Sequence, residues 1–273
     1  MPAGGPFLTG SRLSPMDHED IRVTREGGAL RVAVDRQHVL NALTPRTLEE
    51  LATVLSGDAA GNDVKAVLIT GEGRGFSAGA DLAETPVDGD IGAFLERTYH
   101  PVIRAIAALE KPVIAGVNGV AAGAGLSLAV ACDLRVASSA AVFALGFTGI
   151  GLVMDAGSSY HLPRLVGVGR TMDLALGNRR LSAEEAKEFG LVERVLPAEG
   201  FADAVWELVK TLAEGPTLSY ALVKRQLQST LLNDLDAQLA LEAGAQSRAA
   251  ASRDVREGVA AFREKRAPRF EGR

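Results

Sequence analysis

The sequence has little of several residue types that other classes of protein require. Only one of its 273 residues is a cysteine, Cys132, so an internal disulfide is excluded and a reducing, cytoplasmic location is expected. Aromatic residues make up 5% of the chain, so aliphatic side chains must form most of any core. The net charge of −5 argues against an extended nucleic-acid-binding surface. The sequence contains no run of eighteen apolar residues and no apolar signal core between Met1 and Pro15, so we predict neither a membrane span nor a secretion signal.

The residues that are present alternate between strand and helix patterns. Apolar and polar residues alternate from Ile21 to Asp35 around Gly27-Gly28, which predicts a β-hairpin. Thr44-Pro45 predicts the N-cap and first residue of a helix that ends near Gly57. A buried strand is then predicted over 64–70.

The same unit recurs over residues 71–131. A Gly-rich loop at 71–81 is followed by a predicted helix over 91–109, a strand over 112–117, a second Gly-rich loop at 119–125 and a helix over 125–131. After the strand predicted over 191–196 the pattern becomes helical, with a break at Gly215-Pro216. We therefore predict a disordered segment 1–17, an α/β core 18–197 and a helical C-terminal region 198–273. Alternation alone leaves open whether the core is a doubly wound sheet or a spiral of repeated ββα units.

The two Gly-rich loops are the candidates for chemistry. Each leads from a strand toward a helix, and glycines allow the backbone to turn its N–H groups toward a ligand. A flexible turn is the alternative interpretation of such a loop. The first loop lacks the Gly-Lys-Ser/Thr of a phosphate-binding P-loop, and the second lacks the G-x-G-x-x-G order of a dinucleotide site.

These loops carry a resemblance to a known family. The segments FSAGAD at 76–81 and KPVIAGVNGVAAGAGLSLAVACDLRVAS at 111–138 closely resemble the enoyl-CoA hydratase/isomerase (crotonase) family. The resemblance extends from about residue 20 to the FREKRAPRF segment at 262–270 and includes NAL at 41–43 and LPRLVG at 162–167. It implies a crotonase-like spiral of ββα units whose helical C-terminal region forms a homotrimer or a dimer of trimers.

The resemblance also implies an acyl-CoA substrate and a set of site residues. The amides of Ala80 and Ala124 would hold the thioester oxygen and stabilise an enolate, as an oxyanion hole does. Coenzyme A would enter as part of the substrate, in reactions such as those of fatty-acid metabolism, and no separate cofactor or metal is implied. The residues implied to contact coenzyme A are Ala78, Asp81 and Leu82, together with Phe262 and Lys265 reaching a neighbouring subunit's ligand.

One departure from the family pattern bears on the reaction. The two glutamates of the family's hydratases align with Ser127 and Phe147, neither of which can act as a general acid or base. Asp155 is a nearby carboxylate that would serve as a helix N-cap by residue type alone. The sequence also resembles the phenylacetate-pathway isomerase branch, which places a single catalytic Asp at this position. We expect an apolar pocket, formed by Leu145, Phe147, Ile150 and Met154, to raise the pKa of Asp155.

His100 leaves further alternatives open. By residue type it is a partly exposed structural histidine, yet the 4-chlorobenzoyl-CoA dehalogenase branch resembles the chain at both His100 and Asp155, where it uses the His to activate water. Isomerisation is the favoured prediction, followed by enoyl-CoA hydration, dehalogenation and a non-catalytic CoA-binding role. A serine hydrolase is not expected because no G-x-S-x-G occurs, and four scattered histidines with one cysteine do not suggest a zinc site.

Overall fold

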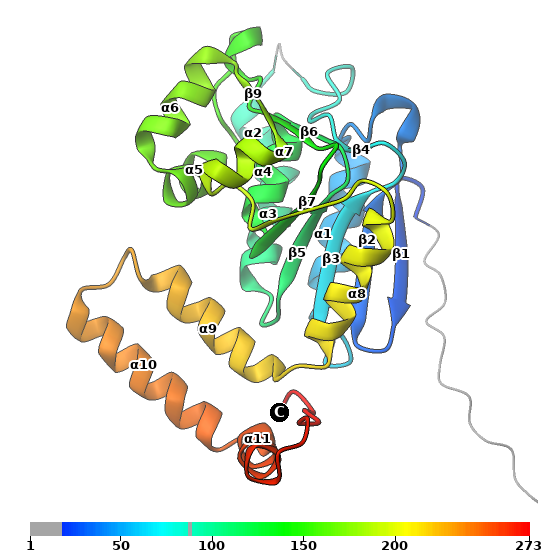
Figure 1. Cartoon of the computed structure of the whole chain (residues 1–273). Coiled ribbons are helices and arrows are strands. Elements are labelled where there is room, and N and C mark those ends of the chain that lie inside the picture. Colours follow the sequence, from blue (N-terminus) through cyan, green and yellow to red (C-terminus); the bar gives the residue numbers. More distant parts are fainter. Residues whose placement is uncertain (1–17, 87–88) are drawn as a thin grey trace, which may run out of the picture.

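The computed structural model describes residues 18–86 and 89–273, and the predicted disordered segment 1–17 lies outside them. In this part of the chain two sheets form the core, with helices packed around them (Figure 1). The larger, six-stranded sheet has the order β1 (Ile21–Glu26), β2 (Ala29–Val34), β3 (Ala66–Gly71), β5 (Val113–Val117), β7 (Leu134–Ser138) and β10 (Arg194–Leu196). The smaller, four-stranded sheet has the order β4 (Gly75–Ser77), β6 (Val120–Ala122), β8 (Val142–Ala144) and β9 (Arg180–Ser182).

Strand order identifies the core as a spiral of repeated units. The successive strand pairs β3–β4, β5–β6 and β7–β8 each place their first strand in the larger sheet and their second in the smaller one. The strands contributed by successive units are parallel in both sheets. This arrangement confirms the predicted ββα spiral and rules out the doubly wound alternative.

Local signals explain where several elements begin and end. Gly27, at φ +57°, forms the turn of the antiparallel β1–β2 hairpin, as predicted. Thr44 caps the first helix through a capping box with Thr47, and Pro45 is its first residue. The α-helices in the described residues are α1 (Pro45–Ser56), α2 (Ile91–Arg97), α3 (Tyr99–Ala108), α4 (Ala124–Ala131), α5 (Ser158–Val166), α6 (Val168–Gly177), α7 (Ala183–Phe189), α8 (Phe201–Ala213), α9 (Thr217–Ser229), α10 (Leu235–Ala250) and α11 (Arg253–Glu264). The short 3-10 helices are η1 (Gln37–Val39), η2 (Asp58–Ala60) and η3 (Thr148–Ile150).

The helix predicted over 91–109 is interrupted at Thr98, where α2 ends and α3 begins. Pro101 explains the interruption. It has no N–H to donate to the carbonyl of Arg97, and its ring would clash with that carbonyl in a continuous helix. The break makes Tyr99 the first residue of a new helix.

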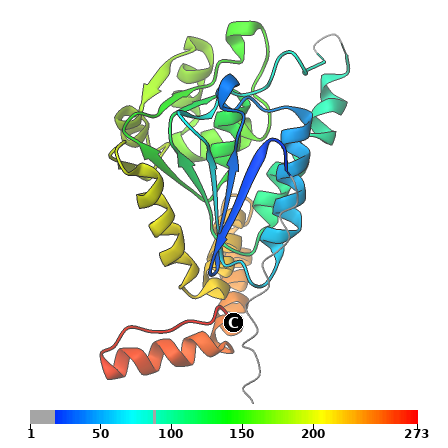
Figure 2. The same ribbon diagram turned by 90° about the vertical axis from the view of Figure 1, so that its right-hand side faces the viewer.

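Both faces of the larger sheet are buried. Along β3, Val67 and Ile69 belong to the main core with α1 and α3, whereas Ala66 and Leu68 belong to a second cluster beneath α8. Figure 2 shows α8 and α1 on opposite sides of the sheet. With both faces covered, the sheet is a rigid support for the turns at the ends of its strands.

The C-terminal helices α9, α10 and α11 extend away from the sheets as an arm (Figures 1 and 2). Lys224 of α9 anchors the arm to the core, because its ammonium lies 2.9 Å from the carboxylate of Asp133 and donates to the carbonyl of Ile106 at 2.8 Å. The arm exposes large apolar side chains to solvent, including Leu227, Leu231, Leu232, Leu235, Leu239 and Phe262.

Candidate active site

The first candidate amide, that of Ala80, lies in the turn that follows β4. The amide of Leu43 donates to the carbonyl of Gly79 at 2.7 Å, and the amide of Asp81 donates to the carbonyl of Leu43 at 2.9 Å. This short parallel bridge uses the groups on either side of Ala80. Because successive backbone groups of an extended strand point in opposite directions, the N–H of Ala80 points away from Leu43.

The second candidate amide, that of Ala124, is the first of α4. Gly123 precedes it with φ +51° and ψ −126°, a conformation that only glycine adopts readily, and donates its own amide to the carbonyl of Ala144 at 3.0 Å. The first amides of a helix have no acceptor within the helix and carry a positive partial charge. In the residues that the structure describes, neither Ala124 nor Ala80 donates its amide to a protein acceptor.

The two turns are in contact with each other. A Cβ atom placed on Gly79 would lie 3.4 Å from the amide nitrogen of Ala124 and 2.7 Å from the carbonyl oxygen of Ala122. A Cβ atom on Gly123 would lie 4.0 Å from the Cα of Gly79. The two glycines that precede the candidate amides are therefore in contact, and the shared role of Ala80 and Ala124 as donors to one oxygen stays a prediction.

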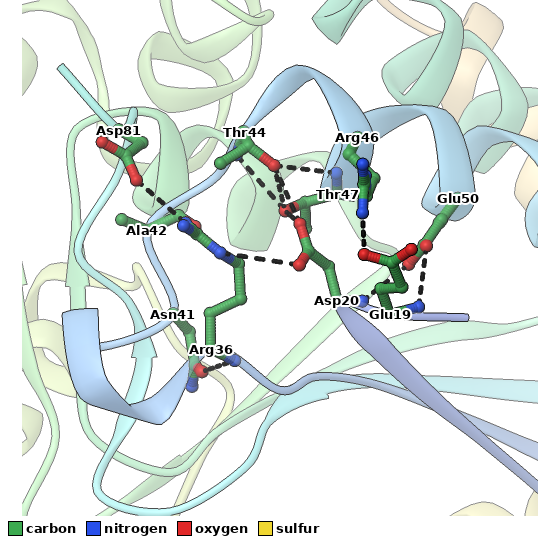
Figure 3. A network of polar contacts seen from close by, with 10 residues as sticks. All are labelled: Glu19, Asp20, Arg36, Asn41, Ala42, Thr44, Arg46, Thr47, Glu50 and Asp81. Atoms are coloured by element: carbon green, nitrogen blue, oxygen red, sulfur yellow. Dashed lines mark hydrogen bonds and ion pairs between the residues drawn. The ribbon is translucent and has the colours of Figure 1, made fainter. Parts of the chain in front are cut away.

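A network of hydrogen bonds and ion pairs holds the turn that carries Ala80 (Figure 3). The guanidinium of Arg36 donates to the carboxylate of Asp81 at 3.0 Å and to the carbonyl of Ala42 at 2.7 Å, and it lies 3.6 Å from the carboxylate of Asp20. Asn41 is fully buried and donates from its side chain to the carbonyls of Glu72 and Gly75, at 2.9 and 2.7 Å. These bonds tie the Gly-rich loop to the start of α1.

Asp155 occupies a strained turn before α5. Ala156 has φ +47° and Gly157 has φ +81°, so two consecutive residues adopt left-handed conformations. The N-cap of α5 is Gly157, and no side chain caps this helix. Asp155 contributes only its main-chain carbonyl, which accepts from the amide and hydroxyl of Ser158 at 2.9 and 2.7 Å. The N-cap interpretation of Asp155 is therefore wrong, and its carboxylate is left for another role.

Asp155 is partly buried, and its buried Oδ1 has no hydrogen-bond partner among the described residues. Burial raises the pKa of Asp155 from 3.8 to about 6. Leu145 and Phe147 are buried and Met154 is partly buried against the same core, in line with the predicted apolar surroundings. Ile150 was wrongly included in that pocket, because η3 carries it outward and its side chain is 58% exposed.

Tyr99, the first residue of α3, is a buried phenol with two carboxylates in its surroundings. The Tyr99 side chain is 3% exposed and its hydroxyl has no partner among the described residues. Burial and the negative charges of Asp155 and Asp81 raise the pKa of Tyr99 above its ordinary value, so the phenol lies within electrostatic range of both carboxylates. One helical turn further along α3, Ile103 lies against Gly157, since a Cβ atom on Gly157 would be 3.3 Å from the Ile103 side chain.

The structure shows no contact between His100 and the turn at Asp155. Adjacent helical residues point about 100° apart, so His100 does not share the face of α3 that Tyr99 and Ile103 present. His100 is partly exposed, and Arg104, four residues later on the same face of α3, is exposed. Its side chain makes no hydrogen bond within the described ranges. The catalytic role of His100 stays a prediction.

The residues predicted to contact coenzyme A are distributed between the first turn and the arm. Ala78 and Leu82 are exposed on either side of the turn, whereas the carboxylate of Asp81 is already paired with a guanidinium. Phe262, which is 84% exposed, and Lys265 lie at the end of α11 in the arm. Within one chain they are remote from the two turns (Figure 1), and all of these contacts stay predictions.

Sequence reasoning missed the part played by Arg36 and by the hydroxyl of Tyr99. Neither has a local signal, because the partners of Arg36 lie up to 45 residues away and the burial of Tyr99 depends on the packing of α3. No helix among the described residues is long and apolar enough to cross a membrane. Across residues 18–86 and 89–273, no cluster of three or more His, Cys, Asp or Glu side chains is placed to hold a metal ion.

Comparisons with known proteins find relatives that match most of this chain. A sequence model of the enoyl-CoA hydratase/isomerase family matches residues 24–273. The chain is 41% identical to 1,2-epoxyphenylacetyl-CoA isomerase of Escherichia coli, over 91% of this chain and 97% of that protein. It is 39% identical to a 4-chlorobenzoyl coenzyme A dehalogenase of an Arthrobacter species, over 79% of each. The crystal structure of an enoyl-CoA hydratase from Bacillus anthracis superposes with a TM-score of 0.88 at 32% identity, covering 93% of this chain and all of that one.

Proposed function

The chain belongs to the enoyl-CoA hydratase/isomerase family, and we propose that it shifts a proton or double bond within an acyl-CoA thioester, using Asp155 as both base and acid. Its relatives by sequence include an isomerase and a dehalogenase that act on CoA thioesters by name. The observation that carries the proposal is the partly buried carboxylate of Asp155, whose Oδ1 has no partner in the described residues. Membership of a family of acyl-CoA enzymes, together with the unpartnered carboxylate of Asp155, supports a reaction in which Asp155 transfers a proton.

The proposed reaction has two proton transfers. The carboxylate of Asp155 removes a proton from the carbon α or γ to the thioester, and the electron pair moves onto the thioester oxygen. The amides of Ala80 and Ala124 donate to that oxygen and stabilise the enolate. The carboxylic acid then returns the proton at the other end of the allylic system, so the carboxylate is regenerated and no further cofactor is needed.

The electrostatics of Asp155 suit this task. A pKa of about 6, raised by burial, allows both the charged and the neutral form to be present near neutral pH. Hydration by two carboxylates has less support, because Ser127 and Phe147 occupy the glutamate positions and both are buried. The relative's name makes phenylacetyl-type thioesters a rational class to test first.

The test is hydrogen exchange in heavy water followed by mass spectrometry. Wild-type protein should exchange the α hydrogens of phenylacetyl-CoA or shift the double bond of an unsaturated acyl-CoA. Asp155→Asn should slow exchange by about 10²–10⁴ while binding CoA normally. Asp173→Asn is the matched control, since that aspartate is exposed on α6 and pairs loosely with Arg179 at 3.6 Å. Unchanged exchange in Asp155→Asn would sink the proposal.

The same assays separate the alternatives. Water addition to crotonyl-CoA, seen as loss of its absorbance, would favour a hydratase. Chloride release from 4-chlorobenzoyl-CoA would favour dehalogenation, which the 39% identity to an Arthrobacter dehalogenase makes worth measuring. Tight CoA binding without any of these reactions would favour a non-catalytic role, which the unpartnered carboxylate of Asp155 opposes.

We further propose that the chain acts in the cytoplasm as a trimer or a dimer of trimers, in which the arm of one subunit reaches the ligand of its neighbour. The exposed apolar side chains of α9 to α11 support assembly, because a contiguous apolar surface is normally covered. Mixing Asp155→Asn subunits with subunits carrying Phe262→Ala and Lys265→Ala provides the test. If arms act between subunits, co-assembled mixtures should exceed the summed activity of the two variants. Activity equal to that sum would contradict the exchange of arms.

A further inference from the structure

Tyr99 holds a buried hydrogen-bond donor that the reaction described above does not use. Its ring packs edge-on against Phe94 of α2, with ring centroids 6.2 Å apart and planes at 65°. This contact and the burial of the side chain fix the ring at the start of α3. A buried hydroxyl without a hydrogen-bond partner destabilises the fold, so an unpartnered hydroxyl in a well-packed structure calls for an explanation.

The surroundings of the hydroxyl point to a ligand. The nearby carboxylates do not accept from it, since Asp81 is bonded to Arg36 and to the amide of Ala83, and Asp155 Oδ1 is itself unpartnered. Burial and these two negative charges raise the pKa of Tyr99, so the phenol remains protonated and keeps a hydrogen to donate. The Tyr99 hydroxyl and the Oδ1 of Asp155 therefore both lack a hydrogen-bond partner near the turn at Asp155.

The position of the phenol separates it from the thioester oxygen. That oxygen has two donors already, the amides of Ala80 and Ala124, and both come from the turns that meet at Gly79. Tyr99 lies one helical turn before Ile103, whose side chain lies against Gly157. This face of α3 is therefore turned toward the Asp155–Gly157 turn, where the proposed reaction would place the acyl carbons. A purely hydrocarbon acyl group would leave the hydroxyl unsatisfied.

Resting on the proposed function, we infer that the Tyr99 hydroxyl donates a hydrogen bond to an oxygen atom carried by the acyl group. The preferred substrates are therefore oxygenated acyl-CoA thioesters, with a hydroxyl, epoxide or carbonyl oxygen beyond the α carbon. Tyr99 selects among substrates, whereas Asp155 moves the proton. Sites that are built to bond a substrate hydroxyl discriminate strongly against analogues that lack it.

The experiment compares the dissociation constants of four thioesters: phenylacetyl-CoA and its 2-, 3- and 4-hydroxy derivatives. Wild-type protein should bind at least one hydroxy derivative roughly tenfold tighter than phenylacetyl-CoA. Tyr99→Phe keeps the ring and its contact with Phe94, and it should abolish this preference while binding phenylacetyl-CoA as before. Tyr220→Phe, in α9, is the matched control and should keep the preference.

The outcomes are separable from those of the proposed function. Exchange of the α hydrogens of phenylacetyl-CoA into heavy water reports on Asp155 alone, because that thioester lacks the extra oxygen. Equal wild-type affinity for all four thioesters overturns the inference, as does a preference that survives in Tyr99→Phe. Either result can occur with normal exchange, in which case the proton-shift proposal stands without the role of Tyr99.

Discussion

Replacing Asp155 by Asn should stabilise the fold while it removes activity. Burial raises the pKa of Asp155 from 3.8 to about 6, and this difference corresponds to about 3 kcal/mol at about 1.4 kcal/mol per pKa unit. Because the side chain is only partly buried, solvent screening reduces this value, and we expect about 1–2 kcal/mol. That gain should raise the Tm at pH 7.5 by roughly 2–8 °C.

The pH dependence gives the sharper form of this prediction. Between pH 3.8 and about 6 the folded state binds the Asp155 proton while the unfolded state has lost it, so rising pH destabilises wild-type protein across this window. The stability lost there stays lost at higher pH. The advantage of Asp155→Asn should therefore be small near pH 4 and complete above pH 6.5, measured by urea denaturation at fixed protein concentration. An advantage that is independent of pH, or a less stable variant at pH 7.5, would refute the argument.

Three further substitutions test the supports of the site. Gly79→Ala should lower kcat by about 10²–10³, because its Cβ would lie 2.7 Å from the carbonyl oxygen of Ala122 and the two turns must separate; steady-state kinetics with an unchanged circular dichroism spectrum would show it. Arg36→Met should cost about 2–3 kcal/mol in urea denaturation, because it leaves the carboxylate of Asp81 without its cation, and adding Asp81→Asn should recover part of the loss. Tyr99→Phe should raise stability by about 1 kcal/mol, since an unpartnered buried hydroxyl is removed; a lower Tm would mean that the hydroxyl has a partner.

Elements with strong local signals could be predicted from the sequence. The β1–β2 hairpin, the Thr44 cap and the break at Gly215-Pro216 all depend on residues within a few positions of one another. Two strands inside the predicted Gly-rich loops were missed. β4 and β6 have three residues each, which is too short to show a periodic pattern.

Some residues of the candidate site could likewise be named from the sequence, and others could not. The amides of Ala80 and Ala124 could be named from a resemblance in two loops, and the contact of Gly79 with the second turn supports their convergence. The role of Asp155 could not be decided, because an aspartate at the start of a predicted helix is commonly its N-cap. The structure shows that α5 begins three residues later, at Ser158, after a left-handed turn at Ala156. The burial of Tyr99 follows from tertiary packing and leaves no local trace.

The fold's unsatisfied polar groups gather where the chemistry is proposed. In the described residues three buried side-chain oxygens or nitrogens lack a partner, and two of them belong to Asp155 and Tyr99. Poor packing is not the reason, because Arg135, which is 3% exposed, is bonded to two carbonyls and a carboxylate. Ala156 adds a left-handed backbone that costs about 1–2 kcal/mol. The other buried charged side chains among the described residues are hydrogen-bonded. Two energetic costs at one turn, an unpartnered carboxylate oxygen and a left-handed alanine, are therefore expected of a site whose missing partner is the substrate. The substitutions that relieve them should therefore be the ones that gain stability and lose function.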